Sequence, residues 1–311
     1  MKADIDKSLI GKRIGIFGKG GSGKSTVAIL LTQALRDQGY HVCLLDADST
    51  NIGLAQALGF ERSPEPLMGY FGGMVFSGGA VTCPVDDPTR LPGANISIDI
   101  LPSKYYVQDD EITLFTAGKI GSQGPGAGCD GPVSKIARDL RVHIEEVPVV
   151  TLVDFKAGFE DSARGAITSL DWALVVVDPT LAAIEMASDM RNMVARMKAR
   201  ELPATMHLES PELVALANRI FIESKIKGVL CVMNRVPDPD MENYLQAELS
   251  RRGINPIGVI REDLSMSIAW LKGMPLDGKK FKKETKKIIK AMETAEALVD
   301  DVERSAQDTK S

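Results

Sequence analysis

Basic residues, which a general nucleic-acid-binding surface requires, are not in excess in this chain. Its 311 residues include 37 Lys and Arg against 42 Asp and Glu, which gives a net charge of −5 and a pI near 5.4. This balance argues against nucleic acid as a partner. No apolar run approaches the roughly 20 residues of a membrane span, and residues 1–8 lack the apolar core of a signal peptide. We therefore expect a cytoplasmic protein.

Cysteine is also sparse, with four widely spaced residues at Cys43, Cys83, Cys129 and Cys231. In a chain without a secretion signal this usage argues against a disulfide framework and suggests reduced thiols. Hydrophobic residues make up 44% of the sequence. A chain of this length and composition can bury a large core, as one large α/β domain or a domain with insertions.

The most informative segment is residues 18–26, which read Gly-Lys-Gly-Gly-Ser-Gly-Lys-Ser-Thr. They fit G-x-x-x-x-G-K-[ST], a loop whose backbone N–H groups cradle phosphates. A short apolar run at 13–17 precedes the loop, and residues 27–35 after it have helical apolar spacing. A strand, a glycine turn and a helix start aim amide dipoles and a helix N-terminus at an anion. The chain is therefore predicted to bind a nucleoside triphosphate.

Each polar position of this loop has an expected role. The cradle comprises Gly20, Gly21, Ser22 and Gly23. Lys24 should hold the β- and γ-phosphates, Ser25 should ligate Mg²⁺, and Thr26 should lie toward the α-phosphate. Lys19 is an additional cation that cannot share one tight cradle with Lys24. It is either a solvated surface lysine or a residue that reaches phosphates held by a second subunit.

Apolar runs alternate with helical patterns along the chain, which predicts a doubly wound, mostly parallel α/β sheet with helices on both faces. We expect one domain over residues 11–304, with insertions at about 61–131 and 201–227 and a flexible tail at 305–311. Residues 118–131 are rich in glycine and predict a flexible loop, and a helix is expected at 211–223. The expected strands lie at 13–17, 41–45, 96–101, 147–153, 173–177, 229–233 and 256–260.

Carboxylates follow two of the expected strands. Asp46 and Asp48 come after the second strand, at the edge where open α/β sheets bind ligands. One of them could hold Mg²⁺ or its water and the other could orient the attacking water, whereas the alternative for Asp48 is to cap the next helix. Asp154 ends a later apolar run and is predicted as the second magnesium element. Gly158 follows and could present a backbone N–H to the γ-phosphate.

These motifs together resemble the MinD/ParA/NifH/CooC group of P-loop ATPases over most of residues 11–275. The resemblance rests on Lys19 in the loop, the D-x-D after the second strand and the D-x-x-A-G of residues 154–158. It implies a homodimer that encloses two ATP molecules, with Lys19 contacting the other subunit's phosphates and Asp48 orienting water. Residues 154–158 would then sense the γ-phosphate. The remaining implied positions are Asn234 and Arg235, which read the adenine, and Arg261 and Asp263, in a loop that closes over the base.

Within this group the chain is most similar to CooC, the nickel-insertion ATPases that serve carbon monoxide dehydrogenase. Residues 126–133 resemble their G-x-G-C-x-C-P-V segment, and residues 154–165 resemble their D-x-E-A-G-x-E-H-x-x-R-G segment. Two departures matter. Gly131 stands where the second cysteine would be, and Lys156 stands where a carboxylate is usual. Two Cys129 thiols across a dimer would supply only part of a Ni²⁺ or Zn²⁺ site, so the alternative is an unliganded loop cysteine.

Two other functions are weighed against this one. A NifH-like iron–sulfur reductase needs a second cysteine shortly after the switch, and residues 154–170 contain none. A MinD- or ParA-like spatial organiser would use a membrane or a partner protein. Residues 279–290 are basic, with apolar residues in helical register, which suits either a membrane-surface helix or a C-terminal helix packed on the sheet. The acidic continuation at 293–303 favours packing.

We therefore predict an ATP-dependent dimeric switch ATPase, which hydrolyses ATP to ADP and phosphate with Mg²⁺. Its expected role is metalloenzyme maturation, either by nickel delivery or by remodelling of a client such as carbon monoxide dehydrogenase.

Overall fold

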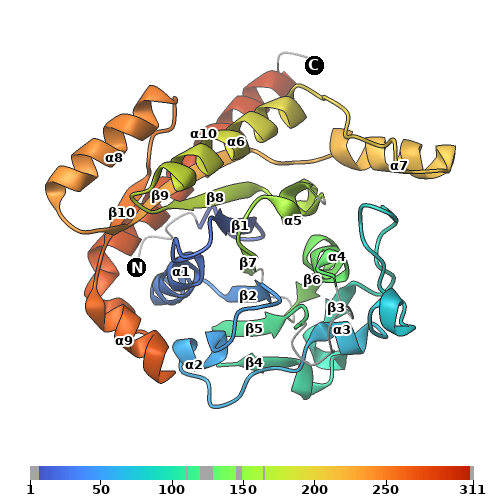
Figure 1. Cartoon of the computed structure of the whole chain (residues 1–311), viewed down its shortest axis with the longest axis horizontal. Coiled ribbons are helices and arrows are strands. Elements are labelled where there is room, and N and C mark those ends of the chain that lie inside the picture. The colour runs from blue at the N-terminus through green and yellow to red at the C-terminus, as the bar shows by residue number, and fades with distance from the viewer. Residues whose placement is uncertain (1–6, 110, 120–128, 145–148, 164, 309–311) are drawn as a thin grey trace.

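The computed structural model describes residues 7–109, 111–119, 129–144, 149–163 and 165–308. One eight-stranded sheet runs through the molecule (Figure 1). All neighbouring strands are parallel except the last pair, which is antiparallel. From one edge to the other the strands are β10 (Gly258–Arg261), β9 (Gly228–Val236), β8 (Trp172–Val177), β1 (Arg13–Gly18), β7 (Val150–Phe155), β2 (Val42–Ala47), β5 (Ile112–Thr116) and β4 (Tyr106–Gln108).

Helices cover both faces of this sheet, each above its own hydrophobic core. One face carries α1 (Lys24–Asp37), α2 (Leu54–Leu58), α9 (Leu264–Lys272) and α10 (Lys282–Asp308). The other carries α4 (Gly131–Asp139), α6 (Leu181–Lys198) and α8 (Pro239–Arg251). The predicted doubly wound α/β fold is confirmed. The remaining helices are α3 (Leu67–Tyr70), α5 (Glu160–Ala163) and α7 (Pro211–Ile222), with 3-10 turns at Val75–Ser77, Ile98–Ile100, Ser103–Tyr105, Ala166–Ser169 and Gly278–Phe281.

The central strands are buried on both faces, as a parallel sheet between two helical layers requires. All six residues of β1, β2 and β8 are buried. The carboxyl ends of β1, β2 and β7 lie side by side. Asp154 of β7 is in register with Asp46 of β2 on one side and with Ile16 of β1 on the other. The loop after β1 therefore lies close to the carboxylates at the carboxyl ends of β2 and β7.

The expected strand at 96–101 is wrong as a member of the main sheet. Its first part forms β3 (Asn95–Ser97), which pairs only with β6 (Arg141–His143) in a separate two-stranded sheet, and a 3-10 turn follows at Ile98–Ile100. The main sheet instead uses β5, which the sequence analysis missed. Two of its five residues, Thr113 and Thr116, are polar but buried, so the strand does not read as an apolar run.

The two insertions differ in how much can be described. Within 201–227 the predicted helix is present as α7, and Ser210 caps it by accepting a hydrogen bond from the Glu212 N–H. Most of the predicted loop at 118–131 lies outside the described residues, as do residues 309–311 of the predicted tail.

The basic C-terminal segment forms helix α10, and its apolar residues pack against the rest of the molecule. Ile288, Ile289 and Met292 are buried in the core that α10 shares with α1 and β10. This apolar surface packs within the molecule, as the packed-helix alternative expected. Within the described part of the chain, no helix is both long and apolar enough to cross a membrane.

Candidate nucleotide-binding site

The loop between β1 and α1 opens onto a cavity of about 650 Å³. Helix α1 begins at Lys24, and no side chain caps its first N–H groups. Gly23 precedes it with φ +87°, and a Cβ there would lie 2.3 Å from Asn234 Nδ2, so only glycine fits. An uncapped helix N-terminus facing a cavity is an anion-binding arrangement. The cavity is lined by these loop and helix residues: Gly20, Gly21, Gly23, Lys24, Ser25 and Thr26.

The two lysines of the loop lie in different surroundings. Lys24 is buried in the cavity wall, and desolvation lowers its pKa while the charge of Asp154 opposes that shift. A triphosphate would supply the charge that this buried ammonium needs. Lys19 is not part of the cavity wall. Its Nζ lies 3.2 Å from Asp178 Oδ2, just after β8.

Ser25 and Asp154 come together as predicted for a magnesium site. Ser25 Oγ donates a 2.6 Å hydrogen bond to Asp154 Oδ2 and accepts one of 2.8 Å from Asn51 Nδ2. Asp154 is fully buried, and its Oδ1 has no hydrogen-bond partner. Desolvation, with a further contribution from the charge of Asp46, raises the pKa of Asp154 to about 7. An orphaned buried carboxylate oxygen beside a hydroxyl fits Mg²⁺, which proteins bind through one or two such groups plus phosphates.

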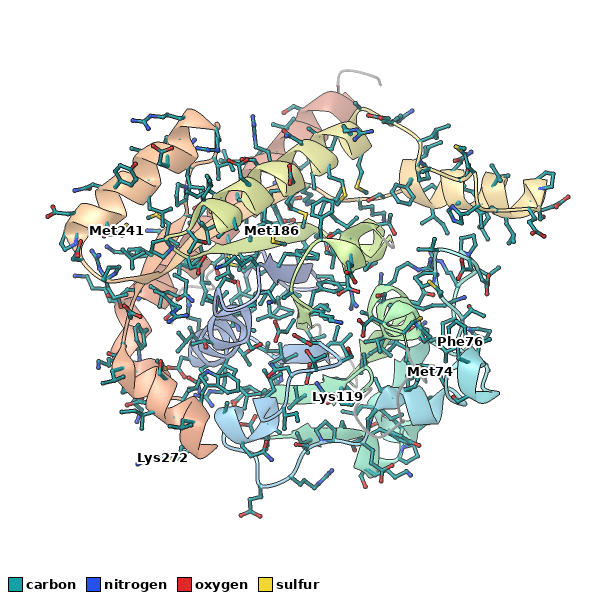
Figure 2. The ribbon with its side chains drawn as sticks, viewed as in Figure 1. Met74, Phe76, Lys119, Met186, Met241 and Lys272 are labelled. Atoms are coloured by element: carbon teal, nitrogen blue, oxygen red, sulfur yellow. The ribbon has the colours of Figure 1, made fainter. Side chains whose placement is uncertain are left out.

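Asp46 has a partner that the sequence analysis did not identify. Its Oδ2 lies 2.7 Å from Lys119 Nζ, and its Oδ1 accepts a 3.1 Å hydrogen bond from the Asp48 N–H. Burial raises the pKa of Asp46 to about 6, although Lys119 opposes the shift. Lys119 Nζ also donates to the Asp48 carbonyl at 2.5 Å. This lysine, labelled in Figure 2, follows β5 and ties the Asp46–Asp48 turn in place. The magnesium role of Asp46 stays a prediction.

Asp48 faces the cavity rather than the next helix. It lines the cavity, and its Oδ1 accepts hydrogen bonds from the Thr50 N–H at 2.9 Å and the Thr50 hydroxyl at 2.7 Å. The helix that follows, α2, has Gly53 at its N-cap. Asp48 therefore does not cap α2 and lies in the cavity wall, and its role in orienting water stays a prediction.

The base side of the cavity contains the four residues that the resemblance implied. Asn234 is buried, and its Nδ2 donates to the Ser22 carbonyl at 2.7 Å. Arg235 adopts φ +56° and donates to the Gly21 carbonyl at 3.0 Å. Arg261 pairs with Glu242, and Asp263 caps α9 by accepting from the Ser265 N–H. All four residues line the cavity. Their role in reading adenine stays a prediction.

The predicted contact of Gly158 with a γ-phosphate stays a prediction. Its N–H donates to the Gly18 carbonyl at 3.2 Å, whereas the neighbouring Ala157 lines the cavity. In this conformation the Gly158 N–H is already used, so contact with a γ-phosphate requires that bond to break.

Asp130 connects the segments that follow β2 and β7. Its carboxylate accepts hydrogen bonds from the Ser49 hydroxyl and from the Lys156 ammonium. Lys156 lies in the predicted γ-phosphate switch, and Asp130 directly precedes α4. The pKa of Lys156 is raised mainly by this hydrogen bond to Asp130. Lys156, which departs from the CooC pattern, is thus paired with the carboxylate of Asp130. This pair links the predicted switch to the residue that follows Cys129.

Gly131, two residues after Cys129, lies against the thiol of Cys83. A Cβ at Gly131 would lie 2.6 Å from Cys83 Sγ, so a cysteine at 131 would force Cys83 to move. Cys43 and Cys231 are buried in strands, and burial raises the pKa of each to about 12. Within the described ranges, no group of three or more His, Cys, Asp or Glu side chains is arranged to hold a metal.

Trp270 is another contact that sequence reasoning missed. Its Nε1 donates a 2.9 Å hydrogen bond to Thr26 Oγ1, which joins α9 to the first turn of α1. Trp270 also lines the cavity, whereas Trp172, the only other tryptophan, is buried with its Nε1 bonded to Glu296. Trp270 is therefore the tryptophan whose fluorescence should change when a ligand occupies the cavity.

We expect Mg-ATP or Mg-ADP to change the tryptophan fluorescence of the protein through Trp270. The Trp270→Phe variant should lose this change, while the matched Trp172→Phe variant should keep it. The measurement is a fluorescence titration of both variants with each nucleotide. An undiminished change in Trp270→Phe would contradict the placement of the nucleotide beside α9.

The parallel sheet, the uncapped α1 and the cavity at the strand carboxyl ends define a P-loop nucleotide-binding protein. Residues 16–276 match the family described as the CobQ/CobB/MinD/ParA nucleotide binding domain. The chain belongs to this family.

Individual relatives agree with the family. An uncharacterised ATP-binding protein of Methanocaldococcus jannaschii is 32% identical over 177 residues, which is 56% of this chain and 70% of the relative. The carbon monoxide dehydrogenase accessory protein CooC of Rhodospirillum rubrum is 28% identical over 182 residues, 58% of this chain and 68% of the relative. Among solved structures, the septum site-determining protein MinD of Pyrococcus horikoshii, complexed with Mg-ADP, is 18% identical with a TM-score of 0.52 over 94% of this chain and 96% of that one. The structural likeness confirms the fold, and the sequence relatives confirm a MinD/ParA-type ATP-binding protein related to CooC.

Proposed function

We propose that this protein is a switch ATPase that dimerises on ATP binding and hydrolyses ATP to ADP and phosphate during maturation of a metalloenzyme. The observation that carries the proposal is the cavity at the start of α1, where Lys24, the Ser25–Asp154 pair and Asp48 converge. The similarity to the carbon monoxide dehydrogenase accessory protein supports the choice of process.

Each of these side chains has a part in hydrolysis. The uncapped N–H groups of α1 and the buried Lys24 bind the phosphates and neutralise charge that develops on the γ-phosphoryl group. Ser25 and Asp154 would hold Mg²⁺, which supplies further neutralisation of the phosphate oxygens when bound. Asp48 orients a water molecule for attack on the γ-phosphorus, and the bond to the β-phosphate oxygen breaks as the new P–O bond forms.

Lys19 supports the dimeric part of the proposal. It lies outside the cavity wall, its side chain is part-exposed, and its one ion pair, to Asp178, spans 3.2 Å. Lys19 is the more exposed partner of this pair, whereas Asp178 is largely buried, so phosphates bound to a second copy would have to draw the Lys19 ammonium away from Asp178. Lys19 would then add its charge to the second copy's ATP.

The cargo is the finer part of the proposal. Nickel delivery would place a Ni²⁺ ion, as cargo, between the Cys129 thiols of two protomers, with the remaining ligands supplied by the client. Remodelling of the client without metal transfer is the alternative. The Ser49–Asp130–Lys156 network supports either version, because it connects the two nucleotide-facing segments to the residue next to Cys129.

Equilibrium dialysis against Ni²⁺ and Zn²⁺ separates the two versions. We expect the wild-type protein with Mg-ATP to take up metal, Cys129→Ser to lose that uptake, and the control variant Cys231→Ser, in a buried strand, to retain it. Equal uptake by wild type and Cys129→Ser would rule out delivery through Cys129 and leave remodelling as the proposed role.

A spatial organiser of the MinD or ParA kind is the second candidate function, favoured only by the fold. The burial of the apolar face of α10 and the net charge of −5 give no support for membrane or nucleic-acid binding. For an iron–sulfur reductase, the described residues of the switch region provide no second cysteine.

A further inference from the structure

A second, larger cavity of about 1030 Å³ lies at the amino ends of the central strands. Its wall includes Arg13, the first residue of β1, whereas the phosphate loop follows Gly18, the last. Six residues of strand separate the two cavities by about 17 Å. The small sheet of β3 and β6, which lies beside α4 in Figure 1, forms another part of the wall. The cationic and amide side chains of this wall are Arg13, Arg90, Asn95, Arg141, His143 and Lys225.

Arg13 is a buried cation that forms no salt bridge with a carboxylate of the described residues, although the charges of Asp139 and Asp171 act on it. It is 6% exposed, its Nη2 donates to the Ala137 carbonyl, and its Nε has no hydrogen-bond partner. Burial and the nearby charge of Arg141 lower its pKa to about 9. A buried guanidinium next to a second one is unfavourable unless an anion compensates both.

Arg141 is the second cation, and among the described residues it also forms no salt bridge, although the charges of Asp139 and Asp171 act on it. Its Nη1 donates to the carbonyls of Arg138 and Leu140, at 3.0 and 2.8 Å. Desolvation lowers its pKa. Among the described residues, no carboxylate lies within ion-pair distance of Arg13, Arg90 or Arg141.

The acidic side chains of the wall do not balance these cations. Asp139 is bound by both Arg138 nitrogens and by the Leu91 N–H. Asp171 accepts a 2.7 Å hydrogen bond from the Arg13 backbone N–H, and desolvation raises its pKa. Glu223 is exposed. Among the described wall residues, Arg and Lys side chains outnumber Asp and Glu side chains by four to three.

We propose that this cavity binds a small organic molecule through an oxoanion, a carboxylate or a phosphate, which the guanidinium groups of Arg13 and Arg141 receive. Planar guanidinium groups match both oxoanions. The wall also contains apolar side chains, including Leu91, Val142 and Ile144, which would contact the organic part of the ligand. The site is independent of the proposed ATPase function, because it shares no wall residue with the nucleotide cavity.

The test uses the full chain with excess Mg-ADP, so that the phosphate loop is occupied. Thermal unfolding and calorimetric titration are followed with inorganic phosphate and with citrate, each against sodium chloride at matched ionic strength. We expect at least one probe to raise the unfolding temperature, since a ligand of the folded state stabilises it. Response to phosphate alone assigns a phosphate ester, response to citrate alone assigns a carboxylate, and response to both assigns a site for either oxoanion.

Variants decide where the probe binds. Arg141→Gln should weaken probe binding by at least about tenfold, whereas Arg251→Gln, an exposed arginine of α8, should leave it unchanged. Arg13→Gln should act like Arg141→Gln, and if its burial prevents folding, Arg141→Gln alone carries the test. The proposal is overturned if neither probe binds the wild type, or if Arg141→Gln binds as well as the wild type. Mg-ADP binding is measured in the same samples, so a failure of the nucleotide site is seen separately.

Discussion

Replacement of Lys24 by alanine is expected to weaken Mg-ATP binding by at least about 30-fold. Lys24 is buried in the cavity wall, and loss of one partner of a buried charge pair costs about 2–5 kcal/mol, with tenfold in affinity for each 1.4 kcal/mol. Isothermal titration calorimetry of Lys24→Ala against the wild type measures the loss. The protein should remain folded, because the variant also removes a desolvated charge.

The matched control for this experiment is Lys290→Ala, an exposed lysine of α10. It should bind Mg-ATP as the wild type does. An affinity of Lys24→Ala within a few-fold of the wild type would show that the cavity at α1 is not where the triphosphate binds.

Asp48→Asn is expected to lower kcat for ATP hydrolysis by about 10²–10⁴-fold, the usual contribution of a positioned acid–base group. Its carboxylate faces the cavity and is fixed by two hydrogen bonds from Thr50. The asparagine keeps the size of the side chain but loses the charge that orients water. Affinity for Mg-ATP should change little, because no phosphate-binding group is removed.

Steady-state phosphate release measures this effect, with Asp99→Asn, an exposed residue outside the cavity, as the control. A kcat for Asp48→Asn close to that of the wild type would assign the orientation of water to another group. Weakened nucleotide binding with unchanged kcat would instead give Asp48 a role in ground-state binding.

The contiguous part of the nucleotide site could be predicted from the sequence. The phosphate loop carries its own geometry, because the glycines, the strand before them and the helix after them are neighbours in the chain. Asp154 could be placed because it ends a long apolar strand, and β2 and β7 are in register at Asp46 and Asp154.

The contacts between distant segments could not be predicted. Lys119 belongs to the turn after β5, a strand hidden by its two buried threonines, so nothing in the sequence linked it to Asp46. Trp270 lies 244 residues from its partner Thr26. Such pairs depend on the order of strands and on helix packing, which periodicity does not specify.

The second cavity was also beyond sequence reasoning. Arg13 begins an apolar strand and reads as an ordinary flanking cation, and Arg141 lies 128 positions away by number. Only the folded arrangement of β1, β6 and α4 brings both arginines into the wall of one cavity, where neither forms a salt bridge with a described carboxylate.

The central claim is that nucleotide in the α1 cavity joins two copies of the chain. Multi-angle light scattering of the Asp48→Asn variant with Mg-ATP, with Mg-ADP and without nucleotide tests it most directly. Slow hydrolysis in this variant should hold the ATP state, and we predict a dimer with Mg-ATP only, whereas Lys19→Ala in the same background should stay at the 33.6 kDa of one chain. A mass of one chain with Mg-ATP bound, confirmed by calorimetry, would contradict the account.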